Sequence, residues 1–222
     1  MNSQDLMKLQ NGSDVRGIAV EGVVDEHVNL TCEACNKIGQ GFIKWLSEKT
    51  GKSANDLKIG VGRDSRVSGP ALEEAVIKGM VSTGASVVRC GLATTPSMFM
   101  SIVFEQTKFD GSIEITASHL PFNRNGLKFF DKDGGLEHDD ITSILEKASS
   151  VEEKDVDISK CESFDLLSIY AEHLKKAISE GIGASSEKPL AGLKIVVDSG
   201  NGASGFFVDK ILNPLGADTT GS

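Results

Sequence analysis

Strand-like and helix-like hydrophobic patterns alternate along most of this chain, and that alternation restricts the folds open to it. Strands that alternate with helices usually form a parallel or mixed sheet with helices packed on its faces. The sequence therefore predicts an α/β fold with a mixed, mostly parallel sheet flanked by helices. We expect strands at residues 15–20, 57–62, 86–91, 111–116 and 127–130, and helices at residues 30–49, 69–83, 96–106, 139–148 and 164–179.

The first long helix carries signals for its start, its buried face and its end. Thr31 is a suitable N-cap, because its hydroxyl can accept a hydrogen bond from the first helical turn. Ile38, Phe42 and Leu46 recur at helical spacing and predict one apolar face, and Gly51 is a stop signal. The start and the end of this helix can therefore be predicted to within a few residues.

A charged, weakly apolar stretch ends the first domain, which we place at residues 1–155. The second unit, residues 156–222, has a helix, a Gly- and Ser-rich linker at residues 180–189, an expected strand at 193–197 and an expected helix at 203–212. A strand, a turn and one helix cannot cover both faces of a parallel sheet. We therefore expect an incomplete second α/β domain, cut off where the next strand should form. Its uncovered apolar face predicts self-association.

The net charge of −9 argues against two classes of partner. An acidic chain repels nucleic acid and anionic membrane surfaces, so we expect neither. No apolar run approaches the ~20 residues needed to span a bilayer, and the N-terminus lacks a secretory signal pattern. A phosphorylated substrate would be repelled as well, unless basic residues reverse the field locally.

The four cysteines do not form the pattern of a secreted disulfide scaffold. We therefore expect a reducing compartment, the cytoplasm, and leave open an organellar transit segment absent from this sequence. Cys32 and Cys35 have CxxC spacing, but no second pair completes a zinc site, and both lie within an expected helix. Two helical thiols without chemistry are favoured over a redox or metal site.

One loop gathers polar and cationic residues around a serine. Ser118 follows the strand expected at residues 111–116, and strand ends are where open α/β sheets bind ligands. His119, Arg124 and Lys128, three potential cations, lie within ten positions of its hydroxyl. A phosphate on Ser118 would add roughly −1.5 to −2 charges at pH 7, and these neighbours would stabilise it. Spacing alone leaves two interpretations open, a phosphoserine site and a solvated basic loop.

A Ser-His hydrolase is the weaker alternative for Ser118 and His119. Adjacent residues at a strand end tend to point apart, and the Gly-x-Ser-x-Gly elbow is absent here. The hydrolase interpretation therefore lacks both the geometry and the motif that it needs.

The segment Thr116-Ala117-Ser118-His119-Leu120-Pro121 resembles the active-serine loop of the α-D-phosphohexomutases, the phosphoglucomutase/phosphomannomutase superfamily. Asn125-Gly126-Leu127-Lys128 resembles the segment that follows this loop. Four other stretches resemble motifs of the family in the family's order, so the resemblance covers nearly the whole chain. They are Asp14–Gly17, Gly62–Gly69, Gly91–Pro96 and Val197–Ala203.

The resemblance implies intramolecular phosphoryl transfer on a hexose phosphate. Ser118 would carry the phosphoryl group and give it to one sugar hydroxyl, after which the other phosphate returns to the serine. His119 and Lys128 match family positions that act in proton transfer and charge stabilisation. Positioned charge of this kind is what phosphoryl transfer generally requires.

The other candidate residues divide into two groups. We predict substrate contacts for Arg16, Arg124 and Asn125, with a simple salt bridge from Arg16 to Asp14 as the alternative. We predict a scaffold that holds the serine loop for Arg63, Asp64 and Arg66.

The sequence departs from the family pattern in two places. Leu120 stands where the family usually has Asn, which removes a side-chain amide beside the serine and bears on loop geometry. The family also binds an essential Mg2+ through an Asp-Gly-Asp-Gly-Asp-Arg loop, and no such string occurs here. Of the metal's ligands, this chain would supply only the phosphate on Ser118.

Two functions follow from these expectations. The first is the N-terminal part of a phosphohexomutase that interconverts the 1- and 6-phosphates of glucose or mannose and is not competent alone. The second is a truncated, non-catalytic paralogue that acts as a binding or regulatory module.

Overall fold

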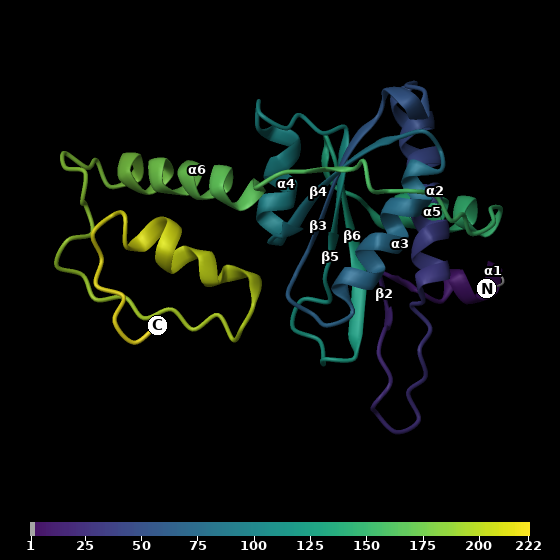
Figure 1. Ribbon diagram of the computed structural model, residues 1–222, viewed down its shortest axis with the longest axis horizontal. Coiled ribbons are helices and arrows are strands. Elements are labelled where there is room, and N and C mark those ends of the chain that lie inside the picture. Colours follow the sequence, from purple (N-terminus) through teal and green to yellow (C-terminus); the bar gives the residue numbers. More distant parts are fainter. Residues whose placement is uncertain (1–2) are drawn as a thin grey trace.

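The computed structural model describes residues 3–222, and its centre is a mixed sheet (Figure 1). β3 is parallel to β4 and to β5, whereas β6 is antiparallel to β5 and to β2. The predicted α/β fold with a mixed sheet flanked by helices is confirmed. Across the sheet the strands stand in the order β1 (Gln10–Asn11), β2 (Asp14–Ile18), β6 (Arg124–Asp131), β5 (Gly111–Ile115), β3 (Lys58–Arg63), β4 (Ser86–Leu92) and β8 (Glu162–Ser163), with β7 (Gly134–Gly135) paired to β6.

Helices lie on both faces of the sheet, and one extends away from it (Figure 1). α2 (Cys32–Thr50), α3 (Gly69–Val81) and α5 (His138–Ser149) lie on one face, and α4 (Thr95–Val103) lies on the other. The short α1 (Ser3–Met7) precedes β1, and α6 (Leu166–Gly181) leads to the C-terminal segment. Within the described part of the chain, no helix has the length and apolar character needed to cross a membrane.

The local signals of α2 act as the sequence predicts. The hydroxyl of Thr31 accepts a hydrogen bond from the backbone N–H of Ala34, which satisfies one donor of the first turn. Gly51 ends the helix with a φ of 71°, a left-handed conformation that glycine adopts without steric cost. The predicted and observed helices differ by two residues at the start and one at the end.

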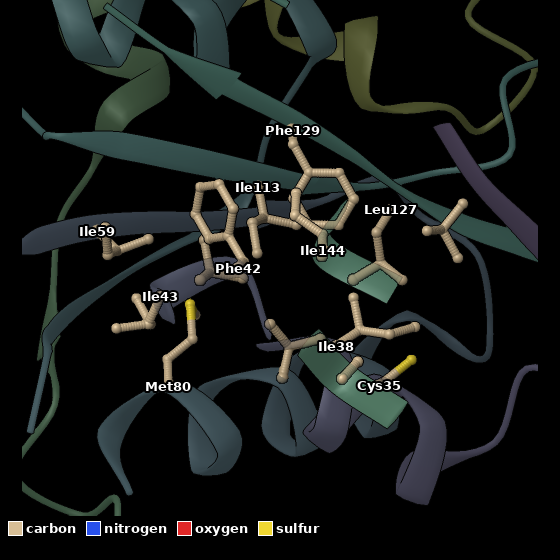
Figure 2. Packing of buried hydrophobic residues seen from close by; sticks show 14 of the residues in the cluster. Cys35, Ile38, Phe42, Ile43, Ile59, Met80, Ile113, Leu127, Phe129 and Ile144 are labelled. Atoms are coloured by element: carbon tan, nitrogen blue, oxygen red, sulfur yellow. The ribbon is translucent and has the colours of Figure 1, made fainter. Parts of the chain in front are cut away.

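The main core lies between the sheet and the layer of α2, α3 and α5 (Figure 2). Phe42 of α2 is fully buried, and its ring centroid lies 5.2 Å from that of Phe129 on β6. Ile59, Ile113 and Phe129 come from three neighbouring strands, so the alternation of side chains along each strand supplies one apolar face. This core fixes the strands whose ends carry the serine loop.

The expected strand at residues 193–197 does not form, which corrects the prediction. The segment makes a single bridge, between Lys194 and Asp218, and Leu193 and Val196 are 52% and 61% exposed. A strand is held by hydrogen bonds to neighbouring strands, and here only one residue pair supplies them. The expected helix at 203–212 is irregular as well: a 3₁₀ turn, Ala203–Gly205, is followed by a π-helical turn, Val208–Leu212.

The C-terminal segment packs mainly on α6 rather than on the sheet. Ile211 and Leu215 cluster with Ala171 of α6 and form a small separate core. The sheet itself extends past residue 155, because β8 pairs with β4. We therefore propose that the boundary between the two units lies at the start of α6, about ten residues after the position expected from the sequence.

Glycines allow α2 and α3 to approach each other at backbone distance. A Cβ added at Gly79 would lie 2.0 Å from the backbone oxygen of Asn36, and one at Gly39 would lie 2.5 Å from that of Val76. Any side chain at these positions would therefore force the two helices apart.

Gly79→Ala should lower the free energy of unfolding by about 1–3 kcal/mol, because the added methyl group overpacks this crossing. Urea denaturation measures the change. Gly181→Ala at the end of α6 is the matched control, since a Cβ there meets nothing within 4 Å, and it should leave stability unchanged or slightly raised. Equal effects of the two substitutions would contradict the close crossing.

Candidate active site

Ser118 stands on the loop that follows β5, in a conformation unusual for a residue with a side chain. Its φ is 55° and its side chain is exposed, whereas Thr116 and Ala117 before it are buried. The backbone N–H of Ser118 donates to the Thr116 hydroxyl at 3.0 Å, and that hydroxyl donates to Asp64 at 2.8 Å. Left-handed backbone at a non-glycine residue persists where its surroundings enforce it, and such residues cluster at functional sites.

The guanidinium of Arg66 holds this loop by its backbone. Arg66 lies between β3 and α3, and its two terminal nitrogens donate hydrogen bonds of 2.7–3.1 Å to four carbonyl oxygens. Three belong to the serine loop, those of Ser118, Leu120 and Pro121, and the fourth belongs to Arg124 at the start of β6. Asp64 orients Arg66 by accepting from its backbone N–H at 3.0 Å and pairing with its Nε at 3.3 Å. One planar, always charged side chain thus fixes four backbone groups.

Arg63, predicted to share this scaffold, is placed differently. Its Nε donates to Glu73 at 3.0 Å, which ties β3 to α3. Among the described residues, its link to the loop is indirect, a 3.3 Å hydrogen bond to the carbonyl of Asp64. Of the three scaffold candidates, Arg66 therefore contacts the backbone of the serine loop and Asp64 accepts from the Thr116 hydroxyl. Arg63 instead ties β3 to α3.

Arg16 and Lys128 are brought together by Asp14, which the sequence analysis named only as a possible partner of Arg16. Asp14 accepts from Lys128 Nζ at 2.9 Å through one carboxylate oxygen and from Arg16 at 2.7 Å through the other. Arg16 also donates to the carbonyl of Thr116, beside Ser118. The salt bridge considered as an alternative for Arg16 thus exists together with a contact to the serine loop. The Asp14–Gly17 motif was the available signal for Asp14.

Ser118 and His119 do not point apart, which corrects the expectation from adjacent positions. The serine Oγ lies 3.2 Å from His119 Nδ1, and both side chains are exposed. The left-handed turn at Ser118 brings the two side chains to the same side. Within the described residues, no carboxylate hydrogen-bonds to His119, so the orienting third member of a hydrolase triad is not supplied there.

Two predicted substrate contacts differ in their exposure. Arg124 is partly exposed and donates to Glu26 at 2.6 Å. Asn125 is fully buried, and its amide donates to the hydroxyl of Ser68 at 2.8 Å. Its Oδ1 also accepts from the backbone N–H of Gly126 at 2.9 Å, so in this structure Asn125 supports the backbone, and its substrate contact stays a prediction.

Residues 7–155 match the family profile described as phosphoglucomutase/phosphomannomutase, alpha/beta/alpha domain I. The chain belongs to the phosphoglucomutase/phosphomannomutase family. The family resemblance expected from the motifs is thereby confirmed, and the serine loop described above lies inside the matched region.

Curated relatives agree with this family. A phosphoglucosamine mutase from Lactobacillus acidophilus is 32% identical over 97% of this chain and 45% of its own length. A phosphoglucosamine mutase from Caldicellulosiruptor bescii is 34% identical over 95% of this chain and 44% of its own. The chain thus spans less than half the length of these relatives.

Solved structures share the fold. A phosphoglucomutase/phosphomannomutase family protein from Burkholderia thailandensis superposes with a TM-score of 0.74 at 23% identity, covering 99% of this chain and 44% of its own. The Paramecium phosphoglucomutase parafusin, in an open form, gives a TM-score of 0.68 at 19% identity, over 93% of this chain and 41% of its own. Similarity at these identities supports the phosphohexomutase fold.

Phosphohexomutases generally depend on Mg2+, an ion that requires several oxygen ligands in octahedral geometry. Asp14 and Asp64 are already engaged with cations and a hydroxyl. Within residues 3–222, no three His, Cys, Asp or Glu side chains gather where they could hold a metal ion. These residues do not form a Mg2+ site by themselves.

The Leu120 departure from the family pattern leaves the hold on the serine loop intact. Arg66 contacts the carbonyl oxygen of Leu120, not its side chain, so a change of side chain keeps the hydrogen bond. The Leu120 side chain is 36% exposed and contributes apolar surface beside the serine.

The CxxC pair is helical, as the favoured interpretation has it. Cys32 begins α2 and Cys35 is fully buried, and both thiols are free. Burial raises the pKa of Cys35, and burial together with Glu153 and Glu74 raises the pKa of Cys32. Raised values keep both thiols protonated and poorly reactive.

Glu114 on β5 is a buried acid near the scaffold. Its Oε2 has no hydrogen-bond partner in the described residues, and the side chain is 1% exposed. Burial, followed by the carboxylates of Asp64 and Glu73, raises the pKa of Glu114 well above its ordinary value, against the opposing effect of Arg63. Glu114 therefore keeps its proton to higher pH in the folded chain than in the unfolded chain.

Arg66→Lys should loosen the serine loop, because an ammonium cannot present the planar fork that reaches four carbonyls. We expect amide hydrogen exchange at residues 117–124 to accelerate about tenfold, as each lost hydrogen bond is worth ~1 kcal/mol. Arg89→Lys is the control, since the Arg89 guanidinium makes no hydrogen bond within the described residues. Unchanged exchange in the Arg66 variant would contradict its role in holding the loop.

Glu114→Gln should flatten the loss of stability that begins as pH rises above the unfolded pKa of this carboxyl group. Above the unfolded pKa of Glu114 the unfolded chain releases this proton while the folded chain retains it. The resulting stability is complete below the unfolded pKa and is lost as pH rises through the raised folded pKa. Urea midpoints across pH measure the slope, with Glu162→Gln, an exposed position on β8, as control. A wild-type slope in the Glu114 variant would contradict the burial argument.

Proposed function

We propose that this chain supplies the phosphoserine part of a phosphohexomutase active site, with Ser118 as the residue that carries the phosphoryl group. The observation that carries the proposal is the exposed Ser118 hydroxyl, held at a φ of 55° on a loop whose backbone Arg66 fixes at three carbonyls. A nucleophile that is already ordered before the substrate arrives loses little conformational entropy when it reacts.

The phosphoryl group would move in two steps on a hexose phosphate. Phosphoserine gives its phosphoryl group to the free sugar hydroxyl, whose proton is taken up, and a hexose bisphosphate forms. The Ser118 hydroxyl then attacks the other phosphate, loses its proton, and releases the isomeric monophosphate. His119, whose Nδ1 lies 3.2 Å from the serine Oγ, would exchange that proton.

Basic side chains would offset the charge of the transferring group. Lys128 and Arg16 lie together on the carboxylate of Asp14, and Arg124 is partly exposed beside the loop. Arg16 and Arg124 would contact the substrate, and Lys128 would stabilise charge near the reacting oxygens. In the complete site, the phosphate on Ser118 would be this chain's contribution to the Mg2+ coordination.

The activities named for the relatives indicate which sugar phosphates are candidate substrates. The curated relatives described above are phosphoglucosamine mutases, so glucosamine phosphate stands beside glucose and mannose phosphates as a candidate. Because this chain covers less than half of those proteins, we propose that residues 1–222 alone do not turn over any of the three.

The four free cysteines support a reducing compartment, the cytoplasm.

Phosphosite mapping tests the proposal directly. After incubation with glucose 1,6-bisphosphate and Mg2+, the intact chain should gain one phosphate, on Ser118, and Ser118→Ala should gain none. Ser65→Ala, at an exposed serine of the neighbouring loop, should be modified like the wild-type chain. Absence of phosphate from Ser118, both as isolated and after incubation, would sink the phosphoserine proposal. Turnover of a hexose 1-phosphate that Ser118→Ala abolishes would overturn the proposed incompetence.

The second candidate is a non-catalytic binding module that associates through its C-terminal segment. Ile182, Leu193 and Val196 are more than half exposed there, and large exposed apolar side chains favour association. Sedimentation at rising protein concentration separates the two functions when combined with phosphosite mapping. Association together with an unmodified Ser118 would favour the module, whereas a phosphorylated, monomeric chain would exclude it.

A further inference from the structure

Asp14 joins two cations that the site needs. Its carboxylate takes Lys128 at 2.9 Å on one oxygen and Arg16 at 2.7 Å on the other. The side chains of Asp14, Arg16 and Lys128 are 17%, 13% and 27% exposed, so the three charges are largely withdrawn from solvent. An ion pair shielded in this way restrains long side chains far more than one at an open surface.

The backbone explains how Arg16 reaches the serine loop. Arg16 on β2 lies opposite Gly126 on β6, and a Cβ at Gly126 would stand 2.7 Å from the Arg16 Cδ. The missing side chain opens a path across β6, along which the guanidinium extends to the carbonyl of Thr116. The hydroxyl of the same Thr116 accepts from the N–H of Ser118.

A continuous chain of contacts therefore runs from Lys128 to the serine through one carboxylate. Lys128 binds Asp14, Asp14 binds Arg16, Arg16 binds Thr116, and Thr116 binds the backbone of Ser118. If the carboxylate were absent, Lys128 and Arg16 would repel each other and lose their common anchor. Nothing else in the described residues accepts a hydrogen bond from Lys128 Nζ.

We propose that Asp14 is a positioning residue for phosphoryl transfer at Ser118. It holds the Lys128 ammonium in place and, through Arg16, fixes the carbonyl at which the serine loop begins. The proposal rests on the proposed function of Ser118, but its geometric part can be measured without any reaction.

Lysine labelling tests the geometric part. In Asp14→Asn, limiting acetylation followed by peptide mass spectrometry should label Lys128 about fivefold faster, because the ion pair that restrains its amine is lost. Lys78 is the matched internal control: its side chain is also 27% exposed and also ion-paired, to Glu74 and Asp155. Equal acceleration at both lysines would indicate general loosening and would overturn the proposal, as would no acceleration at Lys128.

The rate at which glucose 1,6-bisphosphate phosphorylates Ser118 tests the functional part. Asp14→Asn should slow this phosphorylation about tenfold or more, because the transfer depends on the exact positions of the Lys128 and Arg16 charges. Asp14→Glu should restore part of the rate. Asp155→Asn, which removes an ion pair of Lys78, should react like the wild-type chain. If the wild-type Ser118 takes no phosphate, the proposed function and this proposal fail together. If it does and Asp14→Asn is equally fast, the Asp14 proposal alone is overturned.

Discussion

The Arg66 guanidinium is the interaction on which the geometry of this site depends. Three carbonyls of the serine loop and one at the start of β6 point at a single cation, and each accepts a hydrogen bond from it. Their convergence bends the loop and keeps Ser118 in a left-handed conformation that an unrestrained serine would leave. Because the contacts are to backbone oxygens, the loop tolerates changes of side chain such as Leu120, whereas the planar cation itself has no substitute.

A second constraint is the placement of positive charge in a chain of net charge −9. The cations around the serine are each paired in the structure, Arg16 and Lys128 with Asp14 and Arg124 with Glu26. Pairing lets cations approach one another and stay ordered while they are partly withdrawn from water. A phosphorylated ligand would then meet charges already in place, which fits a function based on phosphoryl transfer.

The two units of the chain differ in how far they are packed. The sheet shares one core with α1, α2, α3 and α5, with residues from Leu6 to Ala148, and a second, smaller core with α4. The C-terminal segment has only a small cluster around Ile211 and leaves Leu193 and Val196 exposed. Residues 193–197 have strand-like sequence but one bridging pair, so propensity without neighbouring strands does not produce a strand. The well-packed unit carries the serine loop that the proposed active site needs. The exposed apolar residues of the C-terminal segment are the surface through which the alternative, an associating module, would bind.

By itself the sequence determined the alternating elements, the cap at Thr31, the stop at Gly51 and the loop that carries Ser118, because these depend on neighbours along the chain. Its motifs also placed Arg66 near the serine. Only the tertiary structure decided which partners meet: Asp14 between Lys128 and Arg16, Asn125 buried against Ser68, and His119 turned toward Ser118. The contacts of Asp14 with Lys128 and of Asn125 with Ser68 depend on strand order and register, which bring residues 114 and 57 positions apart within hydrogen-bonding distance and leave no local pattern in the sequence. The contact of His119 with Ser118 depends on the left-handed backbone at Ser118, which the surrounding structure enforces.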